Sequence, residues 1–173
     1  MSGLRTHEFG FVFQQTHLVS NLTLYENVVV AGYLGSGRKA KEVEQRADGL
    51  LCQMGVEKAK DRLPAEVSGG EAQRAAVARA VINRPGILFA DEPTGALNRQ
   101  NTQEVLNLLT GLNEAGQSIL MVTHDVRAAI RGSRILYLED GKILDELTFL
   151  PYRDEAAKDR ENRLNEWLSS LSW

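Results

Sequence analysis

The sequence lacks most features of secreted, membrane-spanning or nucleic-acid-binding proteins. Its single cysteine, Cys52, excludes an internal disulfide and a metal site built from several cysteines. No apolar run is long enough to cross a bilayer, and no basic segment followed by an apolar one stands at the start, as a secretory signal requires. A net charge of −3 argues against a dedicated nucleic-acid binder. We therefore expect a cytoplasmic protein whose role at a membrane would need a partner subunit.

The composition is that of a folded globular domain, with 43% apolar and 25% charged residues in 173 positions. A short apolar strand is predicted at 9–13, and helices follow over 23–83, where apolar residues recur at helical spacing. Cys52 falls in one of these helices, and we interpret it as a small core residue. The first half of the chain is therefore expected to be mostly helical.

The pattern alternates from residue 86 onward. Strands are predicted at 86–90 and 118–123, with a helix over 100–112 between them. A hairpin around Asp140-Gly141 and an amphipathic C-terminal helix follow. Strands that alternate with helices predict an α/β fold, with a mostly parallel sheet and crossover helices.

A glycine pair stands at the start of one predicted helix, in Ser68-Gly69-Gly70-Glu71. Ser68 and Glu71 form a capping box, whereas each glycine costs a helix up to about 1 kcal/mol relative to alanine. Glycine is useful where another group must approach the backbone, and a helix N-terminus attracts anions such as phosphate. On this segment alone, a plain glycine-rich helix start explains the pattern equally well.

Polar side chains follow three predicted strands, at Gln14, at Asp91-Glu92 and at His124. Each has an ordinary explanation alone, because a glutamine can cap a loop, Asp-Glu can begin one, and a lone histidine is more often structural. Ligands bind at the carboxyl ends of the strands in an open parallel sheet, where all three positions would meet. Together they predict a site at this edge.

The two adjacent carboxylates are expected to serve different ligands, since successive residues of an extended chain point to opposite faces. Asp91 would hold Mg²⁺, largely through water, and Gln14 would reach the metal or the attacking water. Glu92 would orient that water and accept its proton. His124 would contact the transferred phosphoryl group and hold Glu92 and the water in line.

Five segments, over about residues 8 to 150, resemble motifs of the ABC-type ATPases in order and in interval. These are the Q-loop Gln14, the signature Ser68-Gly69-Gly70-Glu71, the Walker B strand Ile87 to Glu92, the D-loop Ala96-Leu97-Asn98 and the switch histidine His124. Residues Asp91 to Leu97 are similar to the branch that serves lipoprotein release, macrolide export and antimicrobial-peptide transport.

The resemblance implies a P-loop NTPase-like core at 8–15 and 84–150, an all-helical signature subdomain at 16–83 and a C-terminal amphipathic helix at 151–173. It implies Mg-ATP as cofactor, and a transmembrane permease and a second ATPase subunit as partners, with no nucleic acid. The implied activity is ATP hydrolysis coupled to export, on the inner face of the cell membrane. The transported substrate is selected by membrane subunits.

Three departures from the family pattern matter. Glu71 stands where glutamine is usual, and Asn98 stands where aspartate is usual, which removes a charge at the dimer interface. No G-x-x-x-x-G-K-[ST] motif occurs anywhere in the sequence. We therefore expect that the chain begins inside the domain, without the N-terminal β-subdomain and the Walker A strand and helix.

Without the Walker A amides and lysine, we expect the chain alone to bind ATP weakly or not at all and to be inactive. Its signature motif could still cap a nucleotide held by an intact partner. An apolar sheet edge and face should be exposed and cause self-association. Two alternatives stay open. The first is a non-catalytic regulatory or interaction module. The second is a soluble family member that acts on DNA or ribosomes, but the negative net charge and the short helical insert argue against it.

Overall fold

The computed structural model describes residues 8–37 and 39–171. The chain divides into two compact units, Met1–Val122 and Thr123–Trp173. Each unit contains its own sheet, three-stranded in the first and two-stranded in the second.

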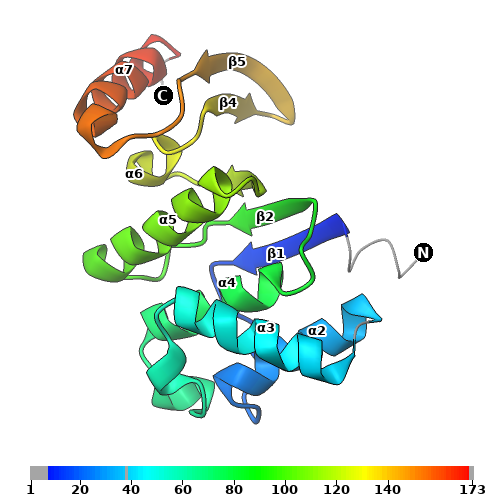
Figure 1. The fold of residues 1–173 in the computed structure, drawn as a ribbon. Helices are drawn as coiled ribbons and strands as arrows, with labels where there is room; N and C mark the ends of the chain where they lie inside the picture. Colours follow the sequence, from blue (N-terminus) through cyan, green and yellow to red (C-terminus); the bar gives the residue numbers. More distant parts are fainter. Residues whose placement is uncertain (1–7, 38, 172–173) are drawn as a thin grey trace. The chain divides into compact units, whose positions relative to one another are not determined.

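The sheet of the first unit is fully parallel and positions the predicted motifs. Its strands are β1 (Phe9–Phe13), β2 (Ile87–Asp91) and β3 (Ser118–Val122), in the spatial order β1-β2-β3. Figure 1 shows β1 and β2 running in the same direction. Phe13, Asp91 and Val122 share the last row of the register. The predicted parallel sheet is confirmed, and the ends of its strands meet at one edge.

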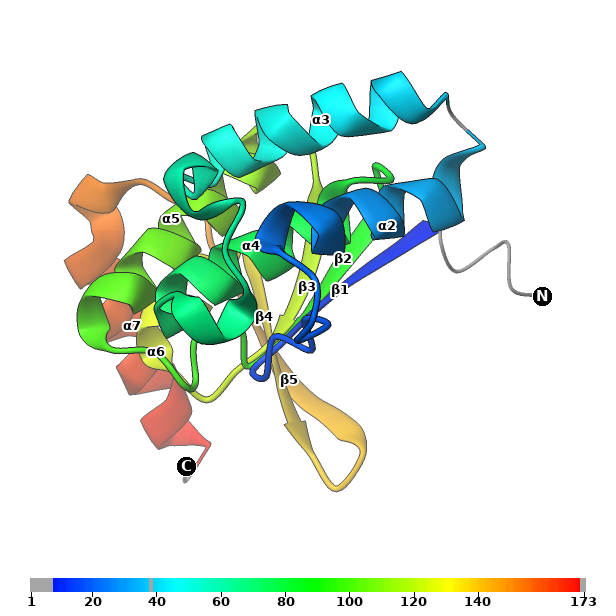
Figure 2. The same ribbon diagram turned by 90° about the horizontal axis from the view of Figure 1, so that it is seen from below.

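One face of this sheet is buried under helices (Figure 2). Val12, Leu88 and Ala90 point into the core, where α4 (Gly69–Val81) packs against β1 and α5 (Arg99–Glu114) packs against β3. Gly10 permits close packing, because a Cβ there would collide with the backbone carbonyl of Ala80 in α4. The signature helix therefore lies directly on the strand that precedes Gln14.

Two further helices, α2 (Leu24–Ser36) and α3 (Ala40–Gln53), complete the helical part of this unit. The predicted capping box is present in α2, where Thr23 Oγ1 accepts a hydrogen bond from the Glu26 amide at 3.1 Å. Gly37 ends this helix with a φ of 56°, in the left-handed region that glycine tolerates. Short 3-10 turns at Glu57–Ala59 and Pro64–Glu66 lead from α3 to α4.

The core role predicted for Cys52 is wrong, because its side chain is exposed. The buried stripe of α3 consists of Val43, Ala47, Leu50 and Leu51. At about 100° per residue, position 52 lies on the opposite side of the helix from the centre of this stripe.

The other face of the parallel sheet carries exposed apolar side chains, as the sequence predicted. Phe11 and Phe89 stack with ring centroids 5.4 Å apart, and the exposed fractions of Leu120 and Val122 are 52% and 59%. Parallel sheets are normally covered on both faces, so this surface is unusual.

The second unit contains α6 (Val126–Ala129), the hairpin β4 (Arg134–Glu139) and β5 (Lys142–Thr148), a 3-10 turn at Asp154–Ala156, and α7 (Ala157–Ser170). Asp140 and Gly141 form the predicted turn, with φ values of 48° and 73°. The C-terminal helix α7 buries Leu164, and Trp167 Nε1 donates to Asp145 Oδ2 at 2.9 Å. Within residues 8–37 and 39–171, no helix has the length and apolarity needed to span a membrane.

Candidate functional site

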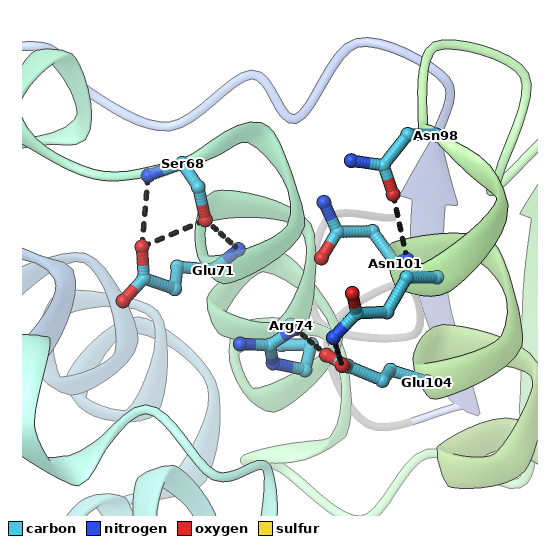
Figure 3. A network of polar contacts seen from close by, with 7 residues as sticks. Ser68, Glu71, Arg74, Asn98, Asn101 and Glu104 are labelled. Atoms are coloured by element: carbon cyan, nitrogen blue, oxygen red, sulfur yellow. Dashed lines mark hydrogen bonds and ion pairs between the residues drawn. The ribbon is translucent and has the colours of Figure 1, made fainter.

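The N-terminus of α4 is closed by the predicted capping box (Figure 3). Ser68 Oγ accepts from the Glu71 amide at 3.2 Å, and Glu71 Oε2 accepts from the Ser68 amide at 2.8 Å. The Ser68 hydroxyl also donates to Glu71 Oε2 at 2.7 Å. The two bonds that Glu71 Oε2 accepts, from the Ser68 hydroxyl and the Ser68 amide, favour the ionised carboxylate and hold the pKa of Glu71 below its ordinary value of 4.5. Glutamate at this position thus performs the capping that the sequence predicted.

The two glycines between these residues have different surroundings. Gly70 is buried, and a Cβ there would collide with the side chain of Asn101 in α5. Gly69 is exposed, and a Cβ there would have Leu97 Cδ2, at 3.7 Å, as its nearest neighbour. The lack of a side chain at Gly70 therefore makes room for Asn101 of the same chain, and the nucleotide-binding role of both glycines stays a prediction. Of the two, Gly69 is the one that is exposed at the surface.

The first turn of α5 lies beside the first turn of α4 (Figure 3). Asn98 Oδ1 accepts from the Asn101 amide at 2.9 Å and so caps α5. Arg74 Nη1 in α4 lies 2.5 Å from Glu104 Oε2 in α5. Asparagine caps a helix as well as aspartate does, so the departure at Asn98 keeps this local structure.

The Q-loop and D-loop segments also meet in this unit. The Gln14 side chain packs on Gly95, where a Cβ would lie 3.1 Å from Gln14 Cδ. Two residues further on, Leu97 is the neighbour of Gly69, whereas Ala96 is exposed. The structure therefore brings together Gln14, the D-loop and the signature motif, which lie far apart in sequence.

Asp91 and Glu92 differ in backbone conformation. Asp91 is the exposed last residue of β2, whereas Glu92 has a φ of 44° and donates its amide to the Val122 carbonyl at 2.9 Å. The expectation of an extended chain through both residues is wrong, because Glu92 already belongs to a left-handed turn. Such a conformation costs a non-glycine residue about 1 kcal/mol or more, and such residues cluster at functional sites.

The predicted switch histidine, His124, belongs to the second unit and is exposed. The next residue, Asp125, caps α6 and accepts bonds from the Arg127 backbone and guanidinium at 2.8–3.0 Å. Burial raises the pKa of Asp125, but the bonds from Arg127 outweigh burial and leave this pKa below its ordinary value. The role assigned to His124 stays a prediction.

The predicted Mg²⁺ ligands come from neighbouring positions of the sheet edge. Gln14 follows Phe13, the register partner of Asp91. In the part of the chain that the structure describes, no three side chains of His, Cys, Asp or Glu gather in a group that could hold a metal by themselves. A carboxylate and an amide oxygen suit Mg²⁺, which keeps several waters and takes few protein ligands.

Sequence reasoning missed three polar residues of α4 that join it to other segments. Arg74 reaches α5, Gln73 reaches the last residue of β1, and Arg79 reaches the segment after β1. Their signal was weak, because polar residues in an alanine-rich helix also suit a solvent-exposed face.

The comparisons with known proteins agree with this arrangement. The family model described as ABC transporter matches residues 2–95 of the chain. The chain belongs to this family. It is 45% identical over 148 residues to the lipoprotein-releasing system ATP-binding protein LolD of Aquifex aeolicus, covering 86% of this chain and 66% of LolD.

The macrolide export ATP-binding/permease protein MacB of Haemophilus ducreyi is a second relative, 44% identical over 146 residues, which cover 84% of this chain and 21% of MacB. Among solved structures, the dimeric ATP-binding cassette MJ0796 bound to ADP and Pi superposes with a TM-score of 0.76 at 36% identity. That match covers 87% of this chain and 67% of the cassette. The predicted family, its macrolide-export and lipoprotein-release likeness, and the α/β class are confirmed, and the chain spans only part of these relatives.

Proposed function

We propose that this chain is the ATP-binding subunit of an export-type ABC transporter and contributes the signature half of a composite nucleotide site. The observation that carries the proposal is the tip of α4. There the capped N-terminus and the exposed Gly69 lie beside the D-loop residue Leu97, and Gln14 packs on Gly95. A phosphate bound at such a tip would accept hydrogen bonds from backbone amides and would interact favourably with the helix dipole.

The remaining motif residues take the roles that their chemistry allows. Asp91 and Gln14 would hold Mg²⁺, which would neutralise charge on the phosphates. Glu92 would orient the attacking water and accept its proton, and His124 would contact the transferred phosphoryl group. The left-handed conformation of Glu92, with a φ of 44°, supports this assignment, because such conformations in residues other than glycine cluster at functional sites.

The nucleotide would be held mainly by a second ATPase subunit. The 173-residue sequence contains no G-x-x-x-x-G-K-[ST], so the amides and lysine that cradle a triphosphate are lacking in it. We therefore infer that this sequence does not hydrolyse ATP alone. We also infer that the signature motif caps a nucleotide bound by the other subunit, through Ser68, Gly69, Gly70 and Glu71.

A transmembrane permease is the further partner that we propose. The MacB relative is named an ATP-binding/permease protein, and LolD is named the ATP-binding protein of a releasing system. By this likeness the chain would act on the inner face of the membrane, bound to a permease. The permease would select the transported substrate.

Two measurements test this function. We expect calorimetric titration of the chain with Mg-ATP to give no micromolar binding. We expect an immobilised LolD-type cassette that contains the G-x-x-x-x-G-K-[ST] motif to retain the chain only when Mg-ATP is present. Gly69→Glu should abolish this retention, because its carboxylate would repel the phosphate.

Gly49→Glu is the matched control, because Gly49 is also an exposed helical glycine with open space around it. Micromolar binding of Mg-ATP by the chain alone would contradict its proposed inactivity. The lack of the G-x-x-x-x-G-K-[ST] motif favours a second candidate, the non-catalytic interaction module. Retention that is independent of nucleotide, and unchanged in Gly69→Glu, would support this candidate instead.

A further inference from the structure

Two side chains of the signature helix hold the segment that contains Gln14. Gln73 is 1% exposed, and its Nε2 donates to the carbonyl of Phe13, the residue before Gln14, at 2.9 Å. A buried side-chain amide without a hydrogen-bond partner lowers the stability of the fold, so this bond favours the one position of Phe13 in which it can form.

Arg79 holds the same segment on the other side of Gln14. Its guanidinium donates to the carbonyl of Thr16 at 2.7 Å and to that of His17 at 2.6 Å. Within residues 8–37 and 39–171, the hydrogen-bond partners of Arg79 are these carbonyls, and burial lowers its pKa. Hydrogen bonds from a charged donor are about twice as strong as neutral ones.

The conformation that Arg79 holds is an unusual one. His17 has a φ of 47°, which a residue other than glycine adopts only when its surroundings impose it. The Phe13 ring meets the His17 ring edge-on, with centroids 5.4 Å apart. The segment is therefore bent back on itself and tied at both ends to one helix.

We infer that Gln73 and Arg79 are positioning residues that fix the segment 13–17 to α4, so that Gln14 keeps its place beside Gly95. Because α4 also has the signature motif at its N-terminus, the signature and the Q-loop would move as one rigid piece. The tie itself is independent of nucleotide, whereas its consequence for the composite site rests on the proposed function.

The experiment is spin-label spectroscopy of the full chain. Cys52 is the only cysteine and is exposed, so Cys52→Ser provides a background into which one new cysteine can be introduced. A nitroxide at the exposed position Gln15 reports the mobility of the segment, and one at the exposed Glu42 on α3 reports the fold. We expect Arg79→Met and Gln73→Met each to increase the mobile population at position 15 at least about tenfold, without change at position 42.

Matched variants separate positioning from general stability. Arg74→Met removes an arginine from the same helix but leaves the 13–17 segment untouched, so position 15 should keep the parent spectrum. Arg79→Lys retains a cation that can reach one carbonyl and should restore part of the immobile population. If Arg79→Met does not fold, as judged by circular dichroism, Gln73→Met and Arg79→Lys carry the test.

Unchanged mobility at position 15 in both Gln73→Met and Arg79→Met would overturn the inference. An equal increase at positions 15 and 42 would also overturn it, because the two residues would then only support the fold. These spectra need no nucleotide, so they are independent of the retention assay. If the signature and the Q-loop move together, Arg79→Met should weaken ATP-dependent retention severalfold in that assay. Unchanged retention together with a mobile segment at 13–17 would mean that Arg79 only positions this segment.

Discussion

At the scale of single residues, the two glycines of the signature look alike in sequence but differ in structure, because Gly70 is packed against Asn101 and Gly69 is in open surroundings. Gly70→Ala should destabilise the chain by about 1–3 kcal/mol, because the new Cβ would displace Asn101 from a packed contact. Gly69→Ala should be neutral or stabilise by up to about 1 kcal/mol, because its surroundings are open. Urea unfolding followed by circular dichroism measures both values, and equal effects would refute the distinction.

The capping box gives a second prediction at this scale. The pKa of Glu71 is lower in the folded chain than its ordinary value of 4.5, so its stabilising contribution is present above the unfolded pKa and is lost as pH falls through the folded pKa. Glu71→Gln keeps a side-chain acceptor but cannot ionise. We therefore expect the difference in unfolding free energy between the parent and Glu71→Gln to shrink between about pH 6 and pH 3. A constant difference over this range would contradict the role of the charge.

Residues whose role is set by nearby sequence were predictable. Ser68 with Glu71, and Thr23 with Glu26, form their boxes within one helical turn, so spacing alone identifies them. The partner of Gly70 is 31 positions away, and no local pattern points to Asn101. The left-handed conformation of Glu92 was missed for a similar reason, because residues other than glycine rarely adopt it and no local pattern points to it.

At the scale of elements, the junction of α4 and α5 is expected to be held partly by Arg74 and Glu104. Their side chains are 12% and 41% exposed, so we expect a coupling free energy of about 0.5–1 kcal/mol. A double-mutant cycle with Arg74→Met and Glu104→Gln measures it by urea unfolding. The more exposed Arg134–Glu146 pair of the hairpin is the control and should couple more weakly. A control coupling equal to or above that of Arg74–Glu104 would show that burial adds nothing.

The sequence predicted which segments form helices and strands, whereas the residues at which the helices begin and end depend on capping interactions. The helix expected at 100–112 extends over Arg99–Glu114, because the Asn98 side chain caps its start and Gln117 bonds back to the Leu112 carbonyl after its end. The division into a core, a helical subdomain and a tail stays a prediction. What the sequence could not reveal is how α4 joins the Q-loop and the D-loop, since these joints depend on side chains that meet only in the folded chain.

At the scale of the whole molecule, the uncovered face of the parallel sheet governs behaviour in solution. Its apolar residues form adjacent rows across three strands; they are Phe9, Phe11, Phe13, Ile87, Phe89, Leu120 and Val122. A contiguous apolar surface of this kind promotes association. We therefore expect light scattering to give a mass above the 19.2 kDa of one chain as concentration rises.

Substitutions on this face decide whether it is responsible. Leu120→Ser with Val122→Thr should restore the monomer mass, because both side chains project from the exposed face and contribute little to the core. Leu34→Ser is the control, since Leu34 is 77% exposed but lies on α2 rather than on the sheet. A monomeric parent at high concentration would contradict the prediction, and a mass lowered equally by both variants would assign association to general hydrophobicity. A monomer restored only by the sheet variant would mean that this surface must be covered for the subunit to remain soluble.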